Sequence, residues 1–218
     1  HLSSRRQRQM CIRDRYGAQA RHQLADASAY GLEIGAVRSD VPDLLRRVRS
    51  EVDRLNALHL GFLEKAGVQL ISGWGRFMAA DRIGISNQRG GPVREELSAP
   101  RFLVAVGGRP VRPNFPGVEK TWVSDDMFLL EDVPPAMVVV GAGFIACEFA
   151  CILRGLGVAV TQVVRGPRLL RGFDAELAAA VLDGMSEQGI EVLLEQTVVA
   201  VEGDPKALTA RLGNGQSL

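Results

Sequence analysis

The feature that most constrains the fold of this chain is a pair of glycines between a strand-forming and a helix-forming stretch. Met137 to Val140 reads as a strand, Gly141-Ala142-Gly143 as a tight turn, and Phe144 to about Leu156 as a helix. A second strand is expected from Val158 to Val164. With Ala146 the small residues follow the pattern G-x-G-x-x-A, which in this context is typical of a dinucleotide-binding β-α-β unit.

Each small residue has a physical role in such a unit. Gly141 permits the tight turn, Gly143 lacks a Cβ and lets a pyrophosphate approach the backbone, and Ala146 lets the helix pack closely on the strand. The helix N-terminus adds unpaired N–H groups and a positive dipole end. We therefore predict a pyrophosphate site at this turn. The alternative is a glycine-tightened α/β turn that binds nothing.

The residues after the second strand favour one nucleotide over the other. A carboxylate at this strand end usually accepts a hydrogen bond from the ribose of NAD, but here Val164 is followed by Arg165 and no carboxylate occurs before Asp174. Arg165 and Arg171 lie six positions apart and flank Arg168. A guanidinium group is a charged, forked donor that suits phosphate. The pattern predicts NADP rather than NAD, and a solvated basic loop is the alternative.

Composition sets the class of protein. Apolar residues make up 46% of the 218, enough for a sizeable core, and the net charge of +1 gives no electrostatic case for nucleic acid. No apolar run is long enough to predict a membrane span, and no secretory leader is evident. Three cysteines, Cys11, Cys147 and Cys151, do not make a disulfide framework. We expect a cytoplasmic α/β protein without a metal site.

The rest of the chain is divided by composition and periodicity. His1 to Arg15 is polar and arginine-rich, is similar to translated sequencing adapter, and is set aside as a non-native extension. A domain boundary is expected in the proline-rich stretch near residue 112. Before it we expect helices over 16–30 and from the cap Asp40 to Gly67, short strands over 68–72, 76–85 and 101–106, and a turn over 88–92. After it we expect a short helical stretch within 121–132, a helix over 174–188, a third parallel strand over 190–194, and an antiparallel pair over 198–201 and 207–212.

Several motifs in a fixed order resemble one family. They are Phe102 to Pro110 (FLVAVGGRP), Ser124-Asp125, Gly141 to Ala150 (GAGFIACEFA), and Arg165 followed by Leu170 to Asp174 (LRGFD). This order is similar to the flavoprotein disulfide reductases, most of all to the glutathione reductase branch. The resemblance covers about Tyr16 to Leu218. It implies an incomplete FAD-binding domain over 16–112 and a Rossmann-like NADPH-binding domain over 113–218, with a parallel sheet and a β-meander.

The resemblance also implies chemistry. In the family, hydride passes from NADPH to FAD, and the electrons then reach a C-x4-C disulfide that reduces a bound disulfide substrate. Carried over by position, the NADPH residues are Gly141, Gly143, Phe144, Ile145, Glu148, Arg165 and Arg171. The FAD residues are Gly73, Trp74, Gly75, Ala105, Val106 and Gly107. Phe144, in place of a tyrosine lid, and Glu148 would serve catalysis, and His59 would lie on the substrate side.

The resemblance leaves part of the function open. Its first FAD glycine motif and its redox disulfide would precede Tyr16, and its dimerisation domain would follow Leu218, which implies an internal fragment that is inactive alone. His59 replaces a substrate-side tyrosine and weakens the inference of glutathione disulfide, which nevertheless stays the favoured substrate of a homodimeric parent enzyme. The alternatives are a non-catalytic NADP-binding module and a fragment of another family member, such as a mercuric reductase. Cys147 and Cys151 are expected to be inert helix thiols.

Overall fold

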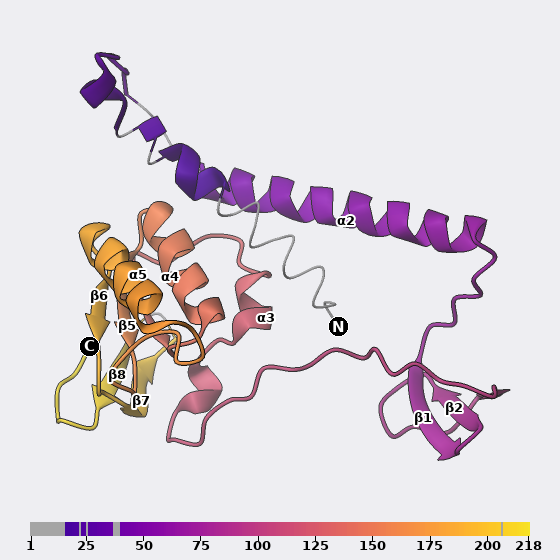
Figure 1. Ribbon diagram of the computed structural model, residues 1–218. Helices are drawn as coiled ribbons and strands as arrows, with labels where there is room; N and C mark the ends of the chain where they lie inside the picture. Colours follow the sequence, from indigo (N-terminus) through magenta and orange to yellow (C-terminus); the bar gives the residue numbers. More distant parts are fainter. Residues whose placement is uncertain (1–15, 22, 25, 37–39, 206) are drawn as a thin grey trace. The chain divides into compact units, whose positions relative to one another are not determined.

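The computed structural model describes residues 16–21, 23–24, 26–36, 40–205 and 207–218, drawn as the coloured ribbon of Figure 1. The expected adapter-like extension, with Cys11, lies outside these residues. The chain divides into two compact units, residues 53–108 and the remainder, which are described separately.

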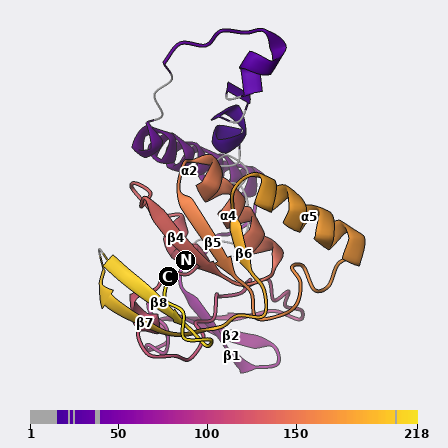
Figure 2. The same ribbon diagram turned by 90° about the vertical axis from the view of Figure 1, so that its left-hand side faces the viewer.

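A three-stranded parallel sheet forms the centre of the larger unit. Its strands are β4 (Ala136–Val140), β5 (Ala159–Val163) and β6 (Glu191–Leu193), in that order across the sheet. Helix α4 (Phe144–Gly155) connects the first two and α5 (Ala175–Glu187) connects the last two. Both crossovers advance in the same direction, so right-handed connections place both helices on one face of the sheet (Figure 2). The predicted parallel β-α-β-α-β arrangement is confirmed.

The core of this unit lies between the sheet and the two helices. It is built from Ala150 and Leu153 of α4, Val160 of β5, Met185 of α5 and Ile190 just before β6, all buried. Valine-rich strands buried by a helix layer are typical of parallel sheets. The glycine turn joins β4 to α4 at the edge of this core, so the candidate site rests on a rigid support.

The predicted antiparallel pair is also confirmed. Strand β7 (Val198–Asp204) pairs with β8 (Ala207–Leu212) in a separate two-stranded sheet. The chain before the parallel sheet holds this pair at η2 (Val118–Lys120): the Val201 N–H donates to the Pro116 carbonyl at 2.9 Å, and Lys120 Nζ donates to the Gly203 carbonyl at 2.9 Å. The expected helical stretch after η2 is short, α3 (Ser124–Met127).

The long predicted helix is α2 (Val41–Lys65). Its cap is the expected one, because Asp40 Oδ1 accepts from the Asp43 N–H at 2.8 Å. Val48 and Val52 are buried against Phe128 and Phe149, whose ring centroids lie 5.6 Å apart. The described residues of 16–26 are helical, and η1 (Ala27–Tyr30) ends at Gly31 as predicted.

The smaller unit contains the second part of α2 and a three-stranded antiparallel sheet. The strands β1 (Trp74–Ala79), β2 (Arg82–Ser86) and β3 (Glu95–Ser98) lie in sequence order. The expected single strand over 76–85 is wrong: the chain turns at Ala80-Asp81 and returns as a hairpin. Polar β3 was not predicted, because its alternation is too weak to distinguish it from a loop. The turn over 88–92 is confirmed by the Gly91 N–H, which donates to the Gln88 carbonyl at 3.0 Å.

Two further predicted strands are wrong. Residues 68–72 and 101–106 are irregular, and neither stretch has a ladder partner among the described residues. A strand needs a neighbour to satisfy its backbone N–H and C=O groups, so an apolar run without one stays irregular. None of the described helices is long and apolar enough to cross a lipid bilayer.

Candidate dinucleotide site

The glycine turn extends the sheet by one bond before the chain enters α4. The Gly141 N–H donates to the Val163 carbonyl at 3.0 Å, so β4 and β5 stay paired up to the turn. Gly141 has φ 143°, and a Cβ there would lie 3.3 Å from the Cβ of Ala146. A larger residue would therefore strain the backbone and crowd the helix. Gly143 begins α4 as its N-cap, and no atom lies within 4 Å of where its Cβ would be. The tight turn predicted at Gly141 agrees with this geometry, and the space beside Gly143 is open.

The turn presents a set of unpaired N–H groups. No described residue accepts a hydrogen bond from the N–H of Ala142, Gly143, Phe144 or Ile145, and the first backbone bond of α4 runs from Cys147 to the Gly143 carbonyl at 3.2 Å. Gly143, Phe144 and Ile145 are exposed. Free N–H groups at the positive end of a 12-residue helix attract an anion. The turn is therefore suited to a phosphate or diphosphate.

The loop between β5 and α5, which carries Arg165, Arg168 and Arg171 and is called the arginine loop below, is hydrogen-bonded directly to this turn. The Leu170 N–H donates to the Ala142 carbonyl at 2.7 Å, which brings the chain between β5 and α5 against the glycine turn. Leu170 takes a left-handed conformation, φ 50°, which is uncommon for a leucine and marks a local constraint. The Phe173 N–H donates back to the Leu170 carbonyl at 2.8 Å. These bonds hold the backbone of the loop against the glycine turn.

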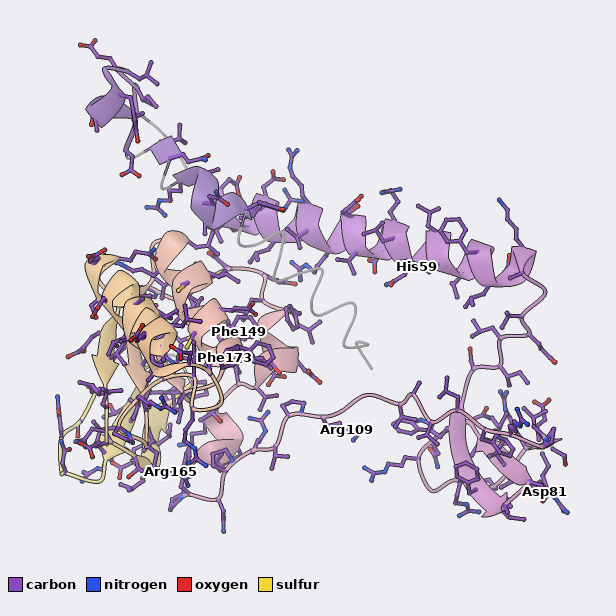
Figure 3. The ribbon with its side chains drawn as sticks, in the orientation of Figure 1. His59, Asp81, Arg109, Phe149, Arg165 and Phe173 are labelled. Carbon is purple, nitrogen blue, oxygen red and sulfur yellow. The ribbon has the colours of Figure 1, made fainter. Side chains whose placement is uncertain are left out.

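The arginines themselves are available to a ligand. Arg165 and Arg171 are exposed, and neither forms an ion pair with a described residue. Arg165 lies two residues after the end of β5, in the same unit as the glycine turn (Figure 3). Arg168 acts differently, because its Nη2 donates to the Arg171 carbonyl at 3.3 Å and braces the loop. The site offers two exposed guanidinium groups on the loop that is bonded to the turn, together with free backbone N–H groups, a combination that suits a ligand with two separate phosphates.

The predicted catalytic residues lie on the first turns of α4. Phe144 and Glu148 are four residues apart on one face, and both are exposed. Cys147, between them in sequence, is buried in the core, and burial raises the pKa of its thiol above the usual value. Cys147 and the partly buried Cys151 are not joined to each other, so α4 contains no redox disulfide. The described residues hold no cluster of three or more histidines, cysteines or carboxylates that could bind a metal ion.

One residue of the site was missed. Gln162 in β5 is fully buried, and its Nε2 donates to the Gly141 carbonyl at 2.8 Å. Its Nε2 also lies 3.7 Å from Cys147 Sγ. The signal in the sequence was a glutamine in a mostly apolar strand that ends just before the arginines. Strand propensity alone does not distinguish such a residue from a solvent-facing one.

The residues predicted for FAD and for the substrate side lie in the smaller unit, residues 53–108. Gly73 directly precedes β1, and Trp74 and Gly75 lie within it, where they pair with Ser86 and Ile85 of β2. Trp74 and Gly75 line a pocket of about 330 Å³ that does not include Ala105, Val106 or Gly107. Val106 is 88% exposed. His59 lies on α2 (Figure 3), and its ring stands edge-on to that of Phe62, with the ring centroids 6.3 Å apart.

Comparison with known proteins gives these features a context. The profile of the family described as Pyridine nucleotide-disulphide oxidoreductase matches residues 12–218. The chain is 36% identical over 197 residues to a glutathione reductase of Nostoc sp. and 34% identical over 203 residues to one of Burkholderia cepacia. It is 33% identical over 187 residues to the chloroplastic/mitochondrial glutathione reductase of Pisum sativum.

These matches cover 90%, 93% and 85% of this chain but only 41%, 44% and 33% of the relatives, so the chain spans less than half of their length. Among solved structures, a Cu(II) complex of the HOCl-induced flavoprotein disulfide reductase of Escherichia coli matches with a TM-score of 0.77. That match covers 96% of this chain and 44% of the other at 18% identity, which is a likeness of fold alone. The profile match extends over nearly the whole sequence, and it establishes that the chain belongs to the pyridine nucleotide-disulphide oxidoreductase family.

Proposed function

We propose that this chain carries the NADPH-binding part of an FAD-dependent disulfide reductase of the glutathione reductase type. The single observation that carries the proposal is the hydrogen bond from the Leu170 N–H to the Ala142 carbonyl at 2.7 Å. It joins the arginine loop to the glycine turn, so one dinucleotide can reach both. The predicted domain division, FAD side over 16–112 and NADPH side over 113–218, is part of this proposal.

The residues divide between the two phosphate groups. The N–H groups of Gly143 and Ile145 bind the diphosphate of NADPH, and Gly141 shapes the turn that presents them. Arg165 and Arg171 bind the 2′-phosphate, which distinguishes NADPH from NADH. Phe144 lies between Gly143 and Ile145 at the start of α4. Glu148 lies one turn further along, and both Phe144 and Glu148 border the nicotinamide. When bound, NADPH would supply the hydride that reduces the flavin.

The described residues fit NADPH better than they fit FAD. The NADPH side has free N–H groups, a position without a Cβ and two guanidinium groups within one unit. Of the residues assigned to FAD, Trp74 and Gly75 line a pocket whose wall does not include Ala105, Val106 or Gly107. We therefore derive no step from them. The disulfide substrate, with glutathione disulfide favoured and His59 on its side, and the homodimeric parent enzyme belong to the proposal through the family alone.

The arginine pair provides the test. Replacing both Arg165→Gln and Arg171→Gln removes charge-assisted bonds to the 2′-phosphate, which we expect to weaken NADPH binding by about 2–4 kcal/mol at about 1.5–3 kcal/mol per bond with non-additivity. NADH binding should hardly change. Isothermal titration calorimetry measures the affinity of each variant for NADPH and for NADH. The matched control is Arg46→Gln with Arg47→Gln, the same change of charge on the exposed face of α2.

The outcomes separate the parts of the proposal. Equal losses for NADPH and NADH would remove the role of the arginines in reading the 2′-phosphate. A wild-type chain that binds neither dinucleotide would remove the proposed function. A chain that binds NADPH but never supports NADPH oxidation coupled to reduction of glutathione disulfide, even with its full flanking sequence and FAD, would be a binding module.

A further inference from the structure

Gln162 occupies a position where an amide is costly. It lies in the middle of the central strand β5, paired with Val139 of β4 and Val192 of β6, and its side chain is 0% exposed. The side chain faces α4, because its Nε2 lies near the Cys147 sulfur as well as the Gly141 carbonyl. Its Oε1 is buried without a hydrogen-bond partner among the described residues. An unsatisfied buried acceptor destabilises a fold, so a glutamine in this place indicates a role other than packing.

The orientation of the amide is fixed by its neighbour. The Gly141 carbonyl oxygen, 2.8 Å from Nε2, can only accept. The reversed amide would place Oε1 against that oxygen, with two acceptors facing each other. In this orientation the Gly141 carbonyl receives a hydrogen bond, and the amide oxygen Oε1 is the atom without a partner among the described residues.

The bond to Gly141 determines where the next N–H points. In a trans peptide the C=O and the N–H point in opposite directions. Because Gln162 holds the Gly141 carbonyl toward the sheet, the Ala142 N–H of the same peptide faces away from it. The following peptide is held in the same manner, since the Ala142 carbonyl accepts from Leu170 and the Gly143 N–H is turned away from the arginine loop.

We propose that Gln162 is a positioning residue, whose amide holds the Gly141–Ala142 peptide so that the Ala142 N–H faces the diphosphate of the dinucleotide. This rests on the dinucleotide binding proposed above and adds a residue that acts only through the turn. Without the amide, the glycine at 141 allows the peptide to rotate, and the Ala142 N–H is lost to the ligand. The role of Gln162 concerns the diphosphate, which NADPH and NADH share, and is distinct from that of Arg165 and Arg171.

The variant Gln162→Met tests this role, because methionine has a similar length and shape but no donor. We expect NADPH and NADH to bind about three- to tenfold more weakly, by the same factor for both, as for the loss of about one hydrogen bond. Binding of 2′-AMP, which carries the 2′-phosphate but no diphosphate, should be unchanged. The Tm should change little, because the variant removes the unsatisfied Oε1 but also leaves the Gly141 carbonyl without its donor. Calorimetric titration and thermal unfolding provide these values.

A second variant, Gln162→Glu, examines the donor itself. A carboxyl group can donate to the Gly141 carbonyl only when protonated, and burial favours the protonated form. With NADH as the probe, which has no 2′-phosphate to titrate, the Glu variant should bind like the Met variant in mildly alkaline buffer and approach wild-type affinity in mildly acidic buffer. The Met variant should show no such gain relative to the wild type.

The possible results are distinct. Unchanged dinucleotide affinity in the Met variant would overturn the role of Gln162 while leaving the proposed function intact. A loss that also affects 2′-AMP and follows a lower Tm would overturn it too, because it would indicate packing alone. A wild-type chain that binds neither NADPH nor NADH would overturn the proposed function and this inference with it.

Discussion

Leucines in two regions of this molecule have opposite surroundings. In the parallel-sheet region, Leu153 of α4 is 2% exposed and packs in the core between the helices and the sheet. In the stretch before the proline-rich connection, Leu103 is 92% exposed, and Val104 and Val106 are exposed with it. Both regions are apolar in sequence, yet only the first forms a core.

The difference lies in where the partners are. In the parallel-sheet region, β4, β5 and β6 follow one another with one helix between each pair, so neighbouring parts of the chain cover the apolar faces. Residues 101–106 have no paired strand among the described residues. Leu103, Val104 and Val106 are exposed, and only the Phe102 ring packs edge-on against Phe77. Apolar sequence supplies a tendency to be buried, and the presence of a partner decides whether burial occurs. An exposed apolar segment of this kind is also a candidate for association.

Matched substitutions in the two regions should produce the largest contrast. Leu153→Ala leaves a cavity in the core and should lower the free energy of unfolding by about 2–5 kcal/mol. Leu103→Ala removes the same atoms from a solvent-facing position and should change it by less than about 0.5 kcal/mol. Urea unfolding followed by circular dichroism measures both. A cost of similar size at both positions would break the comparison, because it would place Leu103 in a core.

The same contrast explains how much of the fold was predictable. The strand, turn and helix from Met137 to Leu156 were predictable because the apolar run, the glycines and the helix pattern are local and agree with one another. The hairpin turn at Ala80-Asp81 was missed, since no glycine or proline marks it. The strand expected at 101–106 depends on a distant partner, which periodicity cannot reveal.

The candidate site divides along the same line. The glycine turn and the arginines were predicted because a motif with fixed spacing describes them. Gln162 and the Leu170–Ala142 hydrogen bond were not, because both depend on three-dimensional contact between parts of the chain. The order of Gly141, Arg165 and Arg171 in sequence indicates a nucleotide site, but the bonds that hold the turn in shape require the structure.

A smaller change in the free energy of unfolding is expected at the N-cap of α5. Asp174 begins α5, and its Oδ1 accepts from the N–H groups of Glu176 at 2.9 Å and Leu177 at 3.2 Å. Asp174→Ala should lower the free energy of unfolding by about 1 kcal/mol, the usual cost of losing an N-cap. Asp174→Asn keeps an acceptor and should retain most of the stability. The two costs separate the contribution of a helix-end hydrogen bond from that of core burial. A cost of Asp174→Ala as large as that of Leu153→Ala would contradict this expectation.

The smallest change in stability is expected in an experiment on thiol reactivity, because the rate at which a thiol is modified reports its exposure in the folded chain. Burial raises the pKa of Cys147, so at a given pH less of it is thiolate, and iodoacetamide should modify it slowly in the folded chain. A thiol introduced by Leu103→Cys in the exposed stretch should react at the rate found for the unfolded chain. Mass spectrometry of each modified site measures both rates.

The sign of the pH dependence follows from the raised pKa of Cys147. The folded state favours the protonated thiol, so its contribution to stability is present below the unfolded pKa and is lost as pH rises through the folded value. Modification of Cys147 should therefore accelerate at a higher pH than modification at position 103. Equal rates at the two sites in the folded chain would mean that α4 does not stay packed on the sheet, and the support for the glycine turn would be lost.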